Sequence, residues 1–350
     1  MLRIITSKLE RSVVKILITI VAVCISSAVF AVPPDEKLVV PGYNGIDADH
    51  LFTQLSEPKV KKGLDFTVGF LQVWGQSRPL TLIGKEVERK TLEYGGKFIT
   101  YDAMGDGQKQ VTQMNQLIAQ KVDVIVAYQI THGTLAQGFK MAQKAGIKVV
   151  SIAVPGDSRT PLDPNVDAMV GMAFDLAGWE TVKTLHDMYP NKKNVAFIGS
   201  AIPSDSLPII ENGMINTAKD LGYNILGRID TKWDGPSMNA GAQALLTKYP
   251  DIEVILAFNE YAALAARQAG RAAGKNILVG SANGGDGAVY KPVKDGTLAV
   301  QYNTAFQETG EAAGIVAYKL LTGQKIPAKR ILFKGVVATQ DNVDFLKLVY

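Results

Sequence analysis

The chain is poor in the residues on which most catalytic and metal sites depend. Its 350 residues include one cysteine, Cys24, and three histidines, His50, His132 and His186, which stand far apart in the sequence. Because zinc sites draw on several Cys or His ligands, a His-based zinc site is not expected. A Ser-His-Asp triad would have to use one of three isolated histidines. The chain also lacks a G-x-S-x-G elbow and a phosphate-binding loop of the usual spacing, so we expect neither an enzyme nor a bound cofactor.

A concentrated run of positive charge is also missing beyond the start of the chain. The 37 Lys and Arg residues and 33 Asp and Glu residues leave a net charge of +4 that is spread along the chain, so nucleic acid is not an expected partner. Apolar residues make up 47% of the chain and charged residues 20%, which favours a sizeable core. The length corresponds to about two domains of ordinary size.

Long apolar runs are absent except near the start. Residues 16–30 form an uncharged stretch that follows four basic residues, and Ala31 ends it. This pattern predicts a secretory signal peptide over residues 1–31, cleaved after Ala31. An uncleaved membrane anchor is the alternative, but the run is short for a membrane span. After cleavage, the chain contains no cysteine and can form no disulfide. Residues 32–63 are polar and irregular, and we expect an N-terminal extension lying on the surface.

From residue 64 onward, strand and helix patterns alternate. Strands are predicted at 65–74, 97–102, 122–129, 147–154, 167–172, 194–200, 223–230, 253–258, 276–282 and 298–303. Helices are predicted at 82–94, 107–120, 135–146, 176–188, 209–221, 238–248, 262–273 and 309–321. Such alternation predicts an α/β fold with parallel sheets whose faces are covered. Two successive runs of the pattern favour two similar lobes over a (β/α)₈ barrel.

One strand end differs from the others in this alternating pattern of strands and helices. In "VILAFNEYAALAARQAG", an apolar strand gives way to Asn259 and Glu260, and a helix follows at once. Polar residues at a strand end are common in loops, but the carboxyl ends of parallel strands are also where α/β proteins hold small ligands.

The order of these segments resembles the type I periplasmic binding proteins of the ribose and galactose kind. The resemblance covers about residues 64–332 and rests on stretches such as "QMNQLIAQKVDVIVAY", "MAQKAGIKVVSIAVPGD", "NGMINTAKDLGYNI", "ILVGSANGGDG" and "DGTLAVQYN". It implies two doubly wound parallel-sheet lobes joined by a three-segment hinge, with a ligand cleft between them. The implied first lobe comprises residues 64–172 and 304–330, and the second comprises residues 173–303 and 331–350.

The resemblance also implies which residues contact the ligand. An aromatic ring would pack on the apolar face of a sugar, and amide groups would donate to and accept from its hydroxyls. The expected ligand-binding residues are Trp74, Gln76, Arg78, Trp233, Asp234, Asn259, Asn283 and Asn303. Glu260 has an alternative role in pairing with local backbone donors, and Asn residues are also common in turns.

Two departures from the family pattern bear on the ligand. Sugar-binding relatives often carry Asp-Arg after the fourth strand, where this chain has Ala153 and Val154, and an Arg where this chain has Ile210. Two charged groups that would form bidentate hydrogen bonds with sugar hydroxyls are therefore missing. The expected ligand is a small polar molecule such as a sugar derivative, a polyol or a sugar acid. Arg78 is a candidate for binding an acidic group of the ligand.

These features favour a periplasmic solute-binding protein that delivers its ligand to an inner-membrane ABC permease. The alternative is a sensory subunit that presents bound ligand to a membrane receptor or kinase, for which the extension over residues 32–63 would offer a contact surface. An enzyme of the two-lobed type is disfavoured by the missing nucleophile and metal ligands. Related repressors share the two lobes, but a signal peptide occupies the end where their DNA-binding helices would lie.

Overall fold

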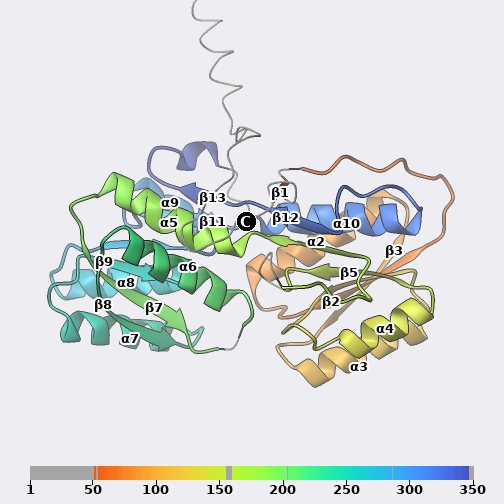
Figure 1. The fold of residues 1–350 in the computed structure, drawn as a ribbon, viewed down its shortest axis with the longest axis horizontal. Helices are drawn as coiled ribbons and strands as arrows, with labels where there is room; N and C mark the ends of the chain where they lie inside the picture. The colour runs from red at the N-terminus through yellow and green to blue at the C-terminus, as the bar shows by residue number, and fades with distance from the viewer. Residues whose placement is uncertain (1–50, 53, 155–159, 203, 286, 347–350) are drawn as a thin grey trace, which may run out of the picture. The chain divides into compact units, whose positions relative to one another are not determined.

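The computed structural model describes residues 51–52, 54–154, 160–202, 204–285 and 287–346. The predicted signal peptide and most of the predicted extension lie outside these residues. The described residues belong to one compact unit and form two α/β lobes (Figure 1).

The first lobe is built on a seven-stranded sheet. Its strand order is β1-β12-β6-β5-β4-β2-β3, and every pair is parallel. The strands are β1 (Leu51–Phe52), β2 (Thr67–Gln72), β3 (Lys97–Asp102), β4 (Val124–Tyr128), β5 (Lys148–Ile152), β6 (Ala168–Met172) and β12 (Arg330–Phe333). The helices are α2 (Arg78–Glu93), α3 (Gly107–Ala119), α4 (Ala136–Lys144) and α10 (Phe306–Leu321). Helices α2 and α10 lie on one face of the sheet, and α3 and α4 on the other (Figure 1).

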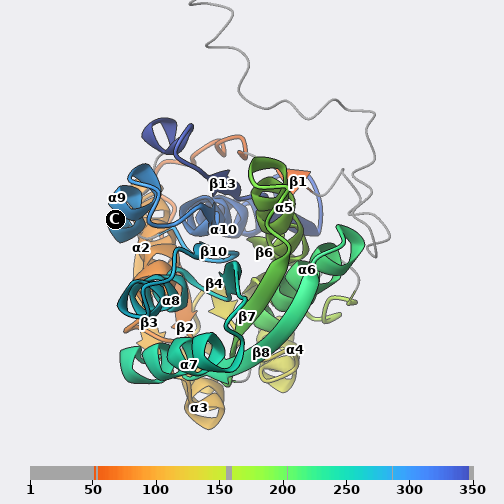
Figure 2. The same ribbon diagram turned by 90° about the vertical axis from the view of Figure 1, so that its left-hand side faces the viewer.

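The second lobe has a six-stranded sheet. Its order is β13-β11-β10-β9-β7-β8, with only the β11–β13 pair antiparallel. The strands are β7 (Asn194–Ser200), β8 (Asn224–Thr231), β9 (Val254–Ala257), β10 (Leu278–Ser281), β11 (Val300–Asn303) and β13 (Val336–Ala338). The helices are α5 (Phe174–Met188), α6 (Leu207–Asp220), α7 (Gly235–Lys248), α8 (Glu260–Ala272) and α9 (Tyr290–Lys294). Figure 2 shows α7 and α8 on one side of β7, and α6 on the other.

The predicted fold class is confirmed, because two separate and mostly parallel sheets exclude a closed barrel. Strands β2 to β6 are almost continuously buried, as expected for parallel strands with helices on both faces, except for the partly exposed edge strand β3.

Three segments pass between the two sheets. They run from β6 into α5, from β11 into α10 and from β12 to β13. The first and third are tied together because the Ala173 amide donates to the Phe333 carbonyl at 2.9 Å. The Gly335 amide donates to the Tyr302 hydroxyl at 2.8 Å, and a Cβ at Gly335 would lie 2.3 Å from the Asn303 carbonyl oxygen. The crossing point therefore requires glycine at position 335.

Two short strands differ from the predicted layout. Strand β12 carries residues 330–333 into the first sheet, so the third crossing begins after Phe333 rather than after Arg330. Strand β1 lies within the predicted irregular extension, yet it pairs with β12 at the edge of the first sheet. A two-residue strand has too little sequence for a period to be visible, which explains why the pattern did not indicate it.

The residues that follow β1 are fastened to the first lobe. The Glu57 carboxylate pairs with Lys90, whose side chain is buried on α2, and accepts a hydrogen bond from the Tyr94 hydroxyl. The Lys61 amide donates to the Tyr318 hydroxyl at 2.8 Å. The described part of the predicted extension thus packs along α2 and α10.

Candidate functional site

The carboxyl ends of β2 and β3 build the first-lobe side of the site. Trp74 follows β2 and is half-buried against Gly105, where a Cβ would lie 2.7 Å from the indole ring. Gly105 also has a φ of +78°, so glycine is required there on two counts. The Asp102 carboxylate accepts hydrogen bonds from the amides of Gly75 and Met104 at 3.0 and 2.9 Å. These contacts fix the loop that carries Trp74.

Gln76 and Arg78 follow Trp74 and are both exposed. Arg78 was expected in a loop, but it is the first residue of α2. The helix starts earlier than the apolar pattern indicates because Pro79 suits the first turn, where its fixed φ is compatible and no amide hydrogen is needed. Arg78 therefore lies at a helix start next to the Trp74 loop.

Trp233 provides the second-lobe side. It follows β8, is 39% exposed, and its Nε1 donates to the Ser200 Oγ at 2.7 Å. Its ring lies 6.5 Å from the Phe258 ring at an interplanar angle of 27°. It also lies 6.3 Å from Trp74 at 49°. The structure therefore brings together two predicted ligand residues that come from different lobes.

A buried carboxylate supports Ser200 from behind. The Ser200 amide donates to Glu211 Oε1 at 3.0 Å, and Arg228 pairs with Glu211 Oε2 at 2.6 Å. Burial raises the pKa of Glu211, while the Ser200 amide and the Arg228 charge oppose the shift. The chain of contacts from Glu211 through Ser200 fixes the orientation of the Trp233 ring.

Asp234 and Asn259 are the N-cap residues of two helices. Asp234 caps α7 by accepting from the Ser237 amide at 2.8 Å, and Asn259 caps α8 by accepting from the Ala262 amide at 2.9 Å. Side-chain oxygens at the cap position satisfy amides that have no partner within the helix. This explains why the strand before Asn259 ends in a polar residue and a helix begins at once. A ligand contact by either residue stays a prediction.

Asn283 and Asn303 lie where β10 and β11 end. Asn283 Oδ1 accepts from the Thr304 hydroxyl at 2.8 Å. A Cβ at Gly285, whose φ is +134°, would lie 2.1 Å from Asn303 Oδ1. Glu260 is buried beside this turn, and a Cβ at Gly284 would lie 2.1 Å from its carboxylate. Close packing of these glycines places both asparagines at the second crossing between the lobes. Contact of Asn283 or Asn303 with a ligand stays a prediction.

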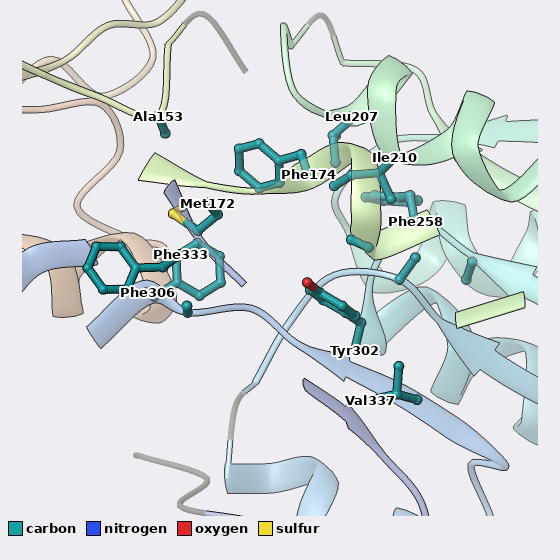
Figure 3. Close-up of a cluster of buried hydrophobic side chains, with 14 of the residues drawn as sticks. Ala153, Met172, Phe174, Leu207, Ile210, Phe258, Tyr302, Phe306, Phe333 and Val337 are labelled. Carbon is teal, nitrogen blue, oxygen red and sulfur yellow. The ribbon is translucent and has the colours of Figure 1, made fainter. Parts of the chain in front are cut away.

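The two departures from the family pattern fall in one apolar cluster. Ala153 is 1% exposed and Ile210 is fully buried, and Figure 3 shows both in a group that also contains Phe174, Leu207 and Phe258. In this view the Phe174 ring lies between Ala153 and the Leu207–Ile210 pair. The members come from both lobes, so the core continues across the crossing segments.

Sequence reasoning missed three of the residues that shape this region. Phe174 and Phe258 each follow within two residues of a strand end, a position that could have been noted from the strand pattern alone. Asp205, from the segment before α6, accepts a hydrogen bond from the backbone amide of His132 in the first lobe. Burial raises the pKa of Tyr128, and the nearby Asp205 carboxylate adds to that shift. Nothing in the local sequence of Asp205 indicates this contact.

Among the described residues, no set of three or more His, Cys, Asp and Glu side chains is arranged to hold a metal ion. Of the helices in the same ranges, none combines the length and apolar character that crossing a bilayer requires.

Comparison with known proteins identifies the family. The sequence profile of the periplasmic binding protein domain matches residues 73–325. The chain is 24% identical to a ribose import binding protein of Bacillus subtilis over 263 residues, covering 75% of this chain and 84% of the relative. It is 30% identical to a D-ribose/D-allose-binding protein of Pseudomonas aeruginosa over 240 residues, covering 63% and 69%.

Solved structures agree with this assignment at the level of fold. The periplasmic binding protein of an arabinose ABC transporter from Shewanella sp. ANA-3 has a TM-score of 0.70 and 21% identity, covering 80% of this chain and 93% of the other. An ABC transporter solute binding protein from Bacillus halodurans with bound myo-inositol has a TM-score of 0.69 and 19% identity, covering 80% and 96%.

Proposed function

Because the chain belongs to the periplasmic binding protein domain family, we propose that it captures a small polar solute, a sugar or sugar derivative, between its lobes and delivers it to an ABC importer. The family consists of solute-binding proteins rather than enzymes. The observation that supports the proposal best is the meeting of Trp74 and Trp233 from opposite lobes at the carboxyl ends of parallel strands.

A solute that touches both tryptophans would favour the closed arrangement of the lobes. In an open arrangement it could contact only one lobe at a time, so its differential affinity would shift the population toward closure. The three crossing segments are the natural hinge, since their backbones connect otherwise separate sheets. The closed form would then be the form that a membrane partner recognises, and no chemical change of the solute is needed.

The location and the partner follow from the same proposal. A signal peptide over residues 1–31, cleaved after Ala31, would release the chain into the periplasm, and an inner-membrane ABC permease would accept the solute. Presentation to a membrane receptor or kinase is the second candidate. The fastening of residues 54–61 to α2 and α10 supports it, because this segment adds a surface outside the matched profile.

Titration of the secreted protein with sugars and polyols tests the proposal. The first probes are D-ribose, D-allose, L-arabinose, D-xylose and myo-inositol, which are named for similar proteins. We expect saturable binding of a compound in this wider class, accompanied by a decrease in the radius of gyration in small-angle X-ray scattering. Absence of both effects across a broad panel of sugars, sugar acids, deoxy sugars and other small ring compounds would contradict the proposal.

A further inference from the structure

The strand ends that approach the junction of the lobes carry apolar side chains. Ala153 and Val154 follow β5, Phe174 follows β6 and Phe258 follows β9, and all are less than 5% exposed. Ile210 adds a fully buried side chain from the first turn of α6. Ligands of parallel α/β sheets meet the loops at these strand ends. All are covered by protein in this structure, so a solute would reach them only where the lobes part, and it would then meet hydrocarbon rather than charged or amide groups.

The polar atoms at the neighbouring strand ends are already used within the protein. The side-chain oxygens of Asp234 and Asn259 cap helices, and Asn283 Oδ1 accepts from Thr304. Trp233 Nε1 is directed to Ser200 rather than to the space beside Trp74. These contacts occupy one acceptor position on each of the three oxygens, which leaves fewer acceptors for the hydroxyl groups of a solute. A hydroxyl buried without a partner weakens binding by about 5- to 150-fold.

An aromatic row connects the apolar cluster to the solvent. Trp74, Trp233 and Phe258 follow one another at 6.3 and 6.5 Å between ring centroids. Trp233 is 39% exposed whereas Phe258 is 1% exposed, so the row runs from the surface into the cluster. A flat ring held between two parallel rings at about 3.5 Å on each face needs their centroids about 7 Å apart. Trp74 and Trp233 are closer, at 6.3 Å, and tilted by 49°, so the two rings contact each other here and would have to move apart to admit a third.

From these three observations we infer that the solute is a ring compound with at least one broad face and edge free of hydroxyl groups and with one polar end. A deoxy sugar acid and an alicyclic or aromatic carboxylic acid both meet this description. The apolar part would contact Trp74, Trp233 and the side chains next to Phe258. The polar end would lie toward the exposed side chains of Gln76 and Arg78. The inference rests on the solute-binding function proposed above; its ligand class overlaps the sugar derivatives proposed there and adds carboxylic acids that have no sugar ring.

Calorimetric titration of the secreted protein with two matched panels tests the inference. One panel contains fully hydroxylated compounds, including D-ribose, D-xylose, D-galactose and myo-inositol. The other contains ring compounds with a face and edge free of hydroxyl groups and one polar end, including cyclohexanecarboxylate and 4-hydroxybenzoate. We expect a member of the second panel to bind at least tenfold more tightly than any member of the first. Its binding should also show a negative heat-capacity change, the signature of apolar burial.

The outcomes separate the ligand class from the function. Tighter binding of a fully hydroxylated compound would overturn the inference and leave the solute-binding function intact. If no compound of either panel binds, once each panel is extended to about a hundred compounds, both the inferred ligand class and the solute-binding function are overturned.

Variants of Trp74 locate the binding. For the ring compound that binds, Trp74→Ala should weaken affinity at least tenfold, whereas Trp74→Phe, which keeps a flat ring, should stay within about threefold. Leu92→Ala, at a 56% exposed position on α2, is the matched control and should leave affinity unchanged. Unaltered affinity in Trp74→Ala would show that the compound binds elsewhere and would overturn the inference.

Discussion

Replacing Ser200 by alanine should weaken solute binding without unfolding the protein. The change removes the acceptor of the Trp233 Nε1 hydrogen bond, which is 2.7 Å long. Trp233 is 39% exposed, so water can replace the lost acceptor and the net cost is that of an ordinary hydrogen bond, about 0.5–1.5 kcal/mol. If that energy holds the ring in its binding orientation, the dissociation constant should rise by about 2- to 13-fold.

The backbone contact behind the ring should survive this substitution. Glu211 accepts from the Ser200 amide, not from its side chain, so Ser200→Ala keeps this contact. The substitution also removes the hydrogen bonds of the Ser200 hydroxyl to the Ile202 carbonyl and from the Ile202 amide, both at 3.1 Å. Thr247→Ala removes a side-chain hydroxyl from an exposed helical position on α7 and serves as the control. Titration calorimetry with any solute that binds measures the effect. Equal dissociation constants for Ser200→Ala and the unmodified protein would refute the idea that this hydrogen bond orients Trp233.

Three other predictions concern charged groups. Asp205→Ala removes the acceptor of the His132 amide between the lobes, so the lobes should part more easily. Solute affinity should fall about fivefold and the radius of gyration without solute should rise; no change in either would exclude a closing role. Burial raises the pKa of Glu211 above its usual 4.5. Between pH 4.5 and the raised pKa, the folded protein therefore holds a proton that the unfolded chain has released. The free energy of unfolding should therefore fall as pH rises through this window, and Glu211→Gln should lack that component when denaturation is measured from pH 4 to 8. Arg78→Ala should weaken binding of an acidic solute at least tenfold while leaving a neutral one unaffected, because charge-assisted hydrogen bonds are the stronger kind. Equal losses for both solutes would remove Arg78 from acid recognition.

Long periodic elements could be predicted from the sequence because their burial repeats over many residues. Strand β3 coincides with the predicted range 97–102, and strand β7 with 194–200. The first predicted helix began four residues late, because its start at Arg78 depends on Pro79 rather than on apolar spacing. Short elements were missed for a related reason: β1 and β13 hold two and three residues, which is too few to show a period.

The candidate site could be predicted only in part. The approach of Trp74 and Trp233 follows from their places after strands whose carboxyl ends face the same junction. The hydrogen-bond partners of the polar side chains could not be predicted from the sequence. The side-chain oxygens of Asp234 and Asn259 can either cap a helix or contact a ligand, and the sequence pattern does not distinguish the two roles. The contact of Asp205 with the other lobe depends on how the lobes meet, which no local pattern encodes.

Native mass spectrometry of the freshly secreted protein, followed by denaturation to release bound molecules, tests the central claim most directly. We expect one small molecule for each chain, namely a ring compound with a broad face and edge free of hydroxyl groups and with one polar end. A released fully hydroxylated sugar would keep the solute-binding function and remove the inferred ligand class. A chain that carries nothing, and that no member of the extended panels stabilises against heat, would contradict the claim that the lobes enclose a solute.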